Sequence, residues 1–181
     1  MHNCLVGSEM CIRDRVHASS LHLNYRGAVI FGCLVRRDKV LDGISLKFRD
    51  RLFHRISEPK NAGMGVRPTG HTILQIEATS EAGQPLWEDD ERTWVKIFED
   101  LEAENIIKRD EIAERHHYRL ANAYPIFKKE YEEHRERFFG FLTRFKNFEC
   151  AGATGAFKAT DLLGAIRDGK EAAQRVMSAL S

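Results

Sequence analysis

The stretch that decides the fold is Phe148-Glu149-Cys150-Ala151-Gly152-Ala153-Thr154-Gly155-Ala156-Phe157, and Asp161 opens an amphipathic segment just after it. The pattern predicts a short apolar strand over 148–151, a turn of small residues and a helix. Unpaired backbone N–H groups and the positive end of a helix dipole meet at such a junction. The junction predicts a cradle for a phosphate-bearing ligand, although a plain strand-to-helix turn also requires small residues.

The composition excludes several classes of protein. The 181 residues are 43% hydrophobic and 30% charged, as in soluble domains that bury a core. With a net charge of +1, the chain has no excess of positive charge of the kind that binds nucleic acid or an anionic membrane. The longest apolar run, 28–35, is far shorter than the roughly 20 residues of a transmembrane helix. We therefore expect a small-molecule substrate as partner, no nucleic acid and no transmembrane segment.

Cysteine and histidine spacing gives no sign of a metal site. The cysteines, at positions 4, 11, 33 and 150, form no CxxC pair, which argues against a disulfide framework or structural zinc. His116 and His117 are neighbours on a predicted strand, so they face opposite sides and cannot chelate one metal. We expect no metal and a reducing, cytoplasmic location.

The first residues resemble a translated sequencing adapter. Residues 4–15, Cys-Leu-Val-Gly-Ser-Glu-Met-Cys-Ile-Arg-Asp-Arg, have neither helical nor strand periodicity. A secretory signal would need an apolar core of about 7–15 residues, which is missing. We interpret residues 1–16 as a foreign leader and the chain as beginning in mid-protein.

The rest of the chain divides into three blocks without repeats. Residues 25–35, 44–53 and 72–79 read as strands, and 61–70 reads as a loop. Acids at 88–91 then open a helix whose apolar residues follow at helical spacing, namely Trp94, Ile97, Phe98 and Leu101. We expect Asn105 to end that helix in the left-handed conformation.

A strand over 115–123 leads to the last block. Helical spacing recurs in a set of aromatic and aliphatic residues, Phe138, Phe141, Leu142 and Phe145, and Asn147 ends that helix. The final helix is expected over 161–179, with its apolar stripe buried: Leu162, Ile166, Gly169, Ala173, Val176, Met177 and Leu180. This order predicts an α/β fold, a mixed α+β sheet with helices on it. No G-x-G-x-x-G motif is present, so a complete dinucleotide-binding domain is not predicted.

With Tyr124-Pro125-Ile126, the stretch over 148–157 resembles the C-terminal segment of the superfamily of flavin-dependent amine oxidases, protoporphyrinogen oxidases and UDP-galactopyranose mutases. The resemblance covers about residues 23–178 and implies FAD as cofactor. It implies a substrate-binding region over 17–123 and the C-terminal part of the FAD-binding domain over 124–181. The N-terminal Rossmann half would be missing.

The resemblance also implies which residues meet the cofactor. The backbone at Gly152, Ala153 and Thr154 would hold the ribityl chain and pyrophosphate. Asp161, with Leu162 and Leu163, would approach the pyrimidine end of the flavin. Relatives commonly carry Gly-Arg where this chain has Gly152-Ala153, so a cationic contact to the cofactor is lost.

A second stretch, Phe53-His54-Arg55-Ile56-Ser57-Glu58-Pro59-Lys60-Asn61, resembles the segment along the substrate side of the flavin in the same proteins. Arg55 could grip a carboxylate or diphosphate and Lys60 could supply a point charge. Tyr124 resembles the tyrosine of the Tyr-Pro pair that closes the cleft. Solvated charges on a strand end, and core packing of Tyr124, remain the simpler alternatives.

The function implied is that of the C-terminal part of a FAD-dependent oxidoreductase. A flavin-dependent nucleotide-sugar mutase and a non-enzymatic α/β interaction module are the alternatives. No residue is assigned as a catalytic acid or base, because the flavin carries the hydride chemistry. The chain alone is expected to bind FAD weakly and to expose an apolar face. Substrate, electron acceptor and oligomeric state are not indicated.

Overall fold

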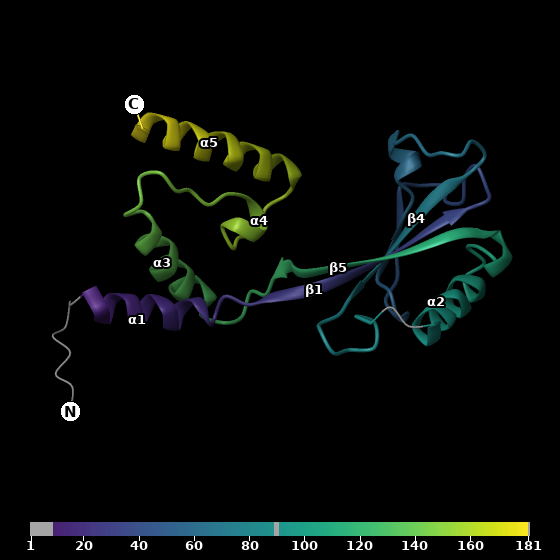
Figure 1. The fold of residues 1–181 in the computed structure, drawn as a ribbon, viewed down its shortest axis with the longest axis horizontal. Coiled ribbons are helices and arrows are strands. Elements are labelled where there is room, and N and C mark those ends of the chain that lie inside the picture. The colour runs from purple at the N-terminus through teal and green to yellow at the C-terminus, as the bar shows by residue number, and fades with distance from the viewer. Residues whose placement is uncertain (1–8, 89–90, 181) are drawn as a thin grey trace. The chain divides into compact units, whose positions relative to one another are not determined.

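A computed structural model describes residues 9–88 and 91–180 (Figure 1). The elements, in chain order, are α1 (Glu9–Ser20), β1 (Tyr25–Val35), β2 (Ser45–Lys47), β3 (Arg55–Ser57), η1 (Pro59–Ala62), β4 (Thr72–Thr79), α2 (Glu91–Ala103), η2 (Arg109–Glu111), β5 (Ile112–Pro125), α3 (Tyr131–Leu142), α4 (Gly152–Gly155) and α5 (Leu162–Leu180). The chain forms two compact units. Unit 1 contains the chain up to Tyr25 and from Asn122 onward, and unit 2 contains Arg26–Ala121.

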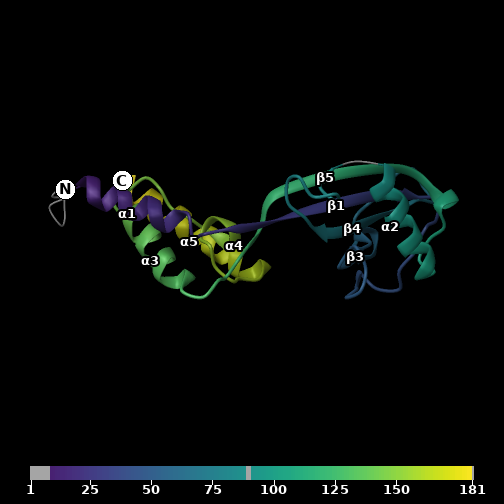
Figure 2. The same ribbon diagram turned by 90° about the horizontal axis from the view of Figure 1, so that it is seen from below.

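Unit 2 is built on a five-stranded sheet with the order β2-β3-β4-β1-β5. The β1–β4, β3–β4 and β2–β3 ladders are antiparallel. Figure 2 shows β4, β1 and β5 side by side. On β1 the side chains of Val29, Phe31, Cys33 and Val35 are all fully buried. Their spacing of two residues places all four on one face of the sheet.

Helix α2 covers that face. Its side chains Trp94, Ile97 and Leu101 are at most 2% exposed, and the Trp94 ring packs edge-to-face on Phe31 with ring centroids 5.0 Å apart. Burying each such large side chain stabilises the fold by roughly 1.5–3 kcal/mol. Asn105, at φ 56°, ends the helix in the left-handed conformation, as the sequence predicts.

Unit 1 is helical, and α1 packs on α3 while α4 packs on α5. Its aromatic core centres on Phe157, which is fully buried and in edge-to-face contact with Tyr25 at 5.1 Å. Phe157 has a φ of 46°, uncommon for a bulky residue, and the packing around it holds that conformation. Residues 1–8 of the predicted leader lie outside the described residues, and residues 9–16 belong to α1.

Two predicted strands are wrong. Residues 148–151 form no strand, because the Phe148 N–H bonds to the Phe145 carbonyl in a local turn and the Phe148 side chain is 49% exposed. The small residues that follow form the short helix α4 instead of an open turn. Of the strand predicted over 44–53, only β2 forms. The Phe48 N–H bonds to the His54 carbonyl, so the remaining residues make the β2–β3 hairpin.

The predicted burial of the last helix is also wrong. The structure exposes 62–75% of the apolar side chains Leu162, Leu163, Ile166, Met177 and Leu180, and in α5 only Ala172 is buried. The helical spacing is correct, but among the described residues no element covers this stripe. Of the helices in 9–88 and 91–180, none combines the length and the apolar character needed to cross a bilayer.

Candidate functional site

The sheet face opposite α2 carries a polar band. Ile56 and Ile76 point into the core under α2, so their neighbours on the strands face the other way. The ladders align these neighbours in two rows across the sheet: Lys47, Arg55, Glu77 and Ile30 in one row, and Ser45, Ser57, Gln75 and Gly32 in the next. We call this surface the open face.

A charged cluster lies at the centre of the open face. Arg55 Nε donates to Glu77 Oε2 at 3.0 Å, and Arg55 Nη2 contacts the same oxygen. His54 Nε2 lies 3.1 Å from Glu77 Oε1. The Glu77 side chain is only 8% exposed, whereas those of Arg55 and His54 are each 42% exposed. A buried carboxylate is thus neutralised by a guanidinium that still reaches solvent.

Beside the cluster, side chains of β5 lie close to Gly32 on the open face. Gly32 is buried in β1, and a Cβ atom there would lie 3.6 Å from His116 Cβ and 3.9 Å from Tyr118 Cε2. Tyr118 is 58% exposed. His117, in contrast, contacts Phe31 on the core side at 4.9 Å, so the two histidines face opposite sides as predicted. Among the described residues, no group of three histidine, cysteine or acidic side chains could hold a metal.

Lys60 lies away from the open face. Its ammonium donates to the Asp38 carbonyl at 2.9 Å, the Asp38 carboxylate at 2.7 Å and the His71 carbonyl at 3.0 Å. An ammonium has three N–H donors, and these three bonds use all of them. Arg55 and Lys60 therefore face different surroundings although they are five positions apart.

In unit 1 the residues predicted to contact the cofactor lie at the junction of α4 and α5. Gly152 begins α4 at φ 72°, a left-handed conformation that glycine adopts without strain. The Thr154 carbonyl accepts a hydrogen bond from the Tyr25 hydroxyl at 2.7 Å. Burial of that hydroxyl, together with the nearby Cys150, raises the pKa of Tyr25.

A carboxylate already occupies the start of α4. Lys158 lies 2.7 Å from Asp168 and lowers the pKa of that carboxyl group, and the nearby backbone N–H of Gly152 lowers it further. Asp168 thus joins α4 to α5. Sequence reasoning missed this residue, because Asp168 sits in an ordinary mixed-charge run on a helix.

Asp161 caps α5. Its Oδ1 accepts a hydrogen bond from the Gly164 N–H at 2.7 Å, and its carbonyl accepts one from the Ala165 N–H at 2.9 Å. A Cβ atom at Gly164 would lie 2.2 Å from Thr160 Oγ1 and 3.0 Å from Asp161 Oδ1, so the capped turn requires glycine there. Leu162 and Leu163, in the first turn, are 75% and 70% exposed.

Tyr124, at the end of β5, is 42% exposed. Tyr124 and Asp161 belong to unit 1, while Arg55 belongs to unit 2. Their approach to one flavin, which the sequence resemblance implies, therefore stays a prediction. Sequence reasoning also missed Glu77 and Gly32. Glu77 could have been found, because it is the one charged residue of the strand over 72–79.

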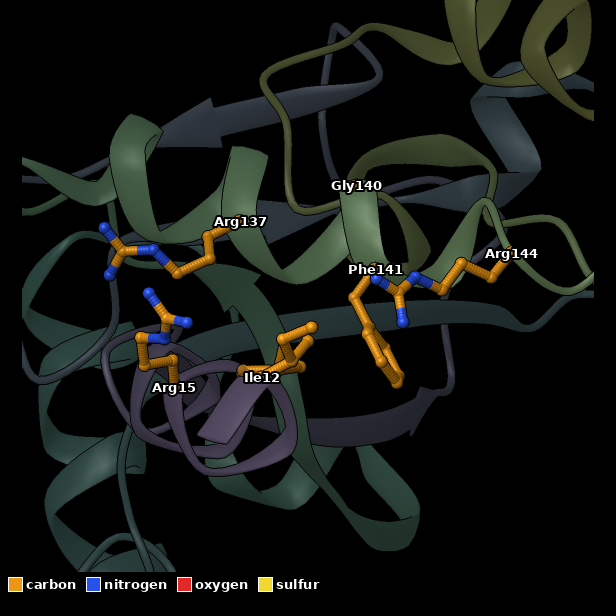
Figure 3. Close-up of a pocket in the computed structure, with 7 residues that line it drawn as sticks. Ile12, Arg15, Arg137, Gly140, Phe141 and Arg144 are labelled. Carbon is orange, nitrogen blue, oxygen red and sulfur yellow. The ribbon is translucent and has the colours of Figure 1, made fainter. Parts of the chain in front are cut away.

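Between α1 and α3 lies a hollow of about 270 Å³, lined by Ile12, Arg15, Val16, Arg137, Gly140, Phe141 and Arg144 (Figure 3). Figure 3 shows the guanidinium groups of Arg15 and Arg137 pointing toward one another. Ile12 and Arg15 belong to the predicted foreign leader. We therefore propose no ligand for this hollow.

No protein-family model and no curated protein matches the chain. Solved structures do match it in fold, among them the following two. Reduced UDP-galactopyranose mutase aligns with 82% of this chain at 18% identity and a TM-score of 0.64, over 32% of its own length. A protein from Exiguobacterium sp. 255-15 assigned as a protoporphyrinogen oxidase aligns with 88% of this chain at 12% identity and a TM-score of 0.60, over 36% of its own length.

The chain thus spans about a third of the length of either solved protein. At these identities the likeness shows the fold alone. That fold is shared with part of a UDP-galactopyranose mutase and with part of the Exiguobacterium protein, two kinds of protein named in the resemblance seen in the sequence.

Proposed function

We propose that this chain is the C-terminal part of a FAD-dependent oxidoreductase of the amine oxidase superfamily, and that the open face is its substrate side. The observation that carries the proposal is the likeness in fold to a UDP-galactopyranose mutase and to a protein assigned as a protoporphyrinogen oxidase, each over more than four fifths of the chain. The sequence resemblance at 148–157 and 53–61 supports it independently of the fold. The proposed location is cytoplasmic.

The proposed cofactor is FAD, which supplies the redox chemistry when bound. The α4–α5 junction fits part of this group. Asp161 uses Oδ1 for the helix cap, so Oδ2 is the proposed acceptor for a cofactor hydroxyl, and the exposed Leu162 and Leu163 offer an apolar surface for a ring. The amides of Ala153 and Thr154 lie in the first turn of α4, where N–H groups have no partner within the helix. These residues are the proposed cofactor contacts.

The amide of Gly152 fits a pyrophosphate less well. The Asp168 carboxylate lies near that amide, and its charge would repel a phosphate placed beside it. The proposed role of Gly152 is therefore to open α4 in its left-handed conformation, leaving phosphate contacts to the amides that follow.

Arg55 carries the proposed substrate contact. A guanidinium has five N–H donors, and Glu77 takes two of them, which leaves donors for a carboxylate or phosphate on the open face. Tyr124 is proposed to stack on the substrate or hydrogen-bond to it. Lys60 could contribute only its charge unless it gave up one of its three present bonds.

The exposed apolar stripe of α5 is proposed to pack on the remainder of the flavin-binding domain in a longer protein. Its five large side chains are at least 62% exposed here, and exposed patches of this kind mark interfaces. This packing would bury the residues that the sequence pattern assigns to a core.

A nucleotide-sugar mutase is the second candidate, because one of the two solved structures is UDP-galactopyranose mutase and Arg55 suits a diphosphate. The third candidate is an α/β module without enzymatic activity. The three candidates predict different behaviour of the protein extended by its upstream reading frame.

The test is to purify that extended protein, record its flavin absorption and assay it with amine substrates and with UDP-sugars. Bound flavin that is reduced by a substrate supports the oxidoreductase. Ring contraction of a UDP-sugar without net electron transfer rejects it in favour of the mutase. A folded extended protein without flavin supports the interaction module.

In the same extended protein, Arg55→Gln should raise KM for an anionic substrate. Arg119→Gln, on β5, is the matched control.

A further inference from the structure

The Glu58 carboxylate is fully buried directly after β3. It accepts hydrogen bonds from the Val40 N–H at 3.1 Å, the Leu41 N–H at 2.6 Å and the Thr72 hydroxyl at 2.7 Å. The Asn61 side-chain amide lies 3.1 Å away. Burial of a carboxylate is costly unless donors satisfy it, and these four donors surround both oxygens.

Two following side chains extend this arrangement. Asn61 Nδ2 lies 2.8 Å from the Leu41 carbonyl and 2.9 Å from the Gly43 carbonyl. Lys60 bonds to Asp38 and to the His71 carbonyl. Glu58, Lys60 and Asn61, which we call the Glu58 clamp, thus join the loop after β1, the turn after β3 and the start of β4.

The clamp acts on a strand that needs support. Strand β3 has only three residues, so it makes few ladder bonds of its own to hold it against its neighbours. A slip of one residue would move Arg55 from the open face to the core face. Glu58 lies three positions after Arg55, about 10 Å along an extended chain. Its bond to Thr72 joins the end of β3 to the first residue of β4.

We propose that Glu58 is a positioning residue that fixes β3 against β4 and so holds Arg55 opposite Glu77 on the open face. The claim that Arg55 then meets the substrate rests on the proposed function. The placement of Arg55 does not depend on it. Within the stretch over 53–61, Arg55 carries the proposed ligand contact. Glu58, Lys60 and Asn61 instead hold the neighbouring loops and strands in place.

The test uses Glu58→Gln in the 181-residue chain, studied by ¹⁵N NMR without flavin or substrate. The substitution removes the negative charge that strengthens the hydrogen bonds from the Val40 and Leu41 amides, and it replaces one of the two acceptor oxygens with an NH₂ group. We expect hydrogen exchange about tenfold faster at those two amides and at Arg55 Nε–H. The amides of Ile97 and Leu101 in α2 should not change. The exposed Glu81→Gln is the matched control and should change none of these signals.

Faster exchange at Val40 and Leu41 with unchanged exchange at Arg55 Nε–H would overturn the positioning role. Glu58 would then only hold the loop after β1. No change at any of the three would reject the clamp itself. If Glu58→Gln does not fold, Thr72→Val removes a single donor, and the same three signals decide. Because the sample holds neither flavin nor substrate, failure of the proposed function cannot produce any of these outcomes.

Discussion

Arg55 and Glu77 lie directly opposite each other in the β3–β4 ladder, and both Nε and Nη2 of the arginine contact the same oxygen, Oε2. The other oxygen of Glu77 lies 3.1 Å from His54 Nε2. Directly opposite residues of unlike charge stabilise a sheet. Here the pair also places a partly exposed guanidinium on the open face, so one contact serves both stability and the proposed ligand site.

Substituting Glu77→Gln should destabilise the chain by about 1–2 kcal/mol. Removing one partner of a buried pair costs roughly 3–5 kcal/mol, but the 42% exposure of the Arg55 side chain lets water screen its charge. Urea denaturation followed by Trp fluorescence measures the change. Glu91→Gln is the control, because its bond to Arg115 is exposed and should be worth under about 0.5 kcal/mol. Equal effects of the two substitutions would show that burial of Glu77 does not matter.

The α5 stripe gives a second prediction. Ile166→Gln with Met177→Gln should reduce binding of the dye ANS and change the free energy of unfolding by less than about 0.5 kcal/mol, because both side chains are more than 60% exposed. Ala172→Gln, at the buried position of the same helix, should be clearly destabilising. A loss of stability in the double variant comparable to that of Ala172→Gln would mean that the stripe is covered.

Cys33 predicts a pH dependence of stability. Burial raises the pKa of this thiol to about 12, only partly offset by the charge of Arg115. An unfolded thiol, at its ordinary pKa of about 9, loses its proton first, so the unfolded state holds fewer protons than the folded state between these values. Stability from this group is complete below about pH 9 and falls as pH rises toward 12, by at most about 1.4 kcal/mol per pH unit.

Comparing denaturation of the parent chain and Cys33→Ala across this range isolates the thiol from the tyrosines and lysines that titrate there. The slope of stability against pH should become shallower in the variant. Identical slopes in the two proteins would contradict the buried position of Cys33.

The cap of α5 is tested by Asp161→Ala, which should destabilise the helix start by about 1 kcal/mol, while Asp161→Asn should cost less because its side-chain oxygen still accepts from Gly164. Hydrogen exchange of the Gly164 amide reports the change. Gly164→Ala should act like Asp161→Ala, since its methyl group would displace Thr160 and the cap. A protected Gly164 amide in Asp161→Ala would refute the cap.

Elements with strong local patterns could be predicted from the sequence. Strands β1 and β4 have the predicted bounds, and the apolar residues of α2 are buried as their spacing indicates. Each of these patterns can be recognised from its own segment alone, because one face of each element is buried by its immediate neighbours.

Features that depend on distant partners could not be predicted. An apolar run such as 148–151 is also compatible with an irregular segment when no strand pairs with it. The stripe of α5 shows amphipathic spacing but carries no information on what covers it. Asp168 could be assigned only after Lys158 and Gly152 had been placed near it, whereas Glu77 is recognisable in the sequence as the one charged residue of its strand.

The central claim is that this chain forms part of a flavoprotein, and the most direct measurement is the flavin content of the protein extended by its upstream reading frame. The account predicts a flavin absorption spectrum with about one FAD per chain. It also predicts that Asp161→Ala weakens FAD retention by about 1–3 kcal/mol, with Asp161→Asn costing less. The 181-residue chain alone should hold little flavin. A folded extended protein that binds no flavin, or an Asp161→Ala variant that keeps its flavin fully, would contradict the account.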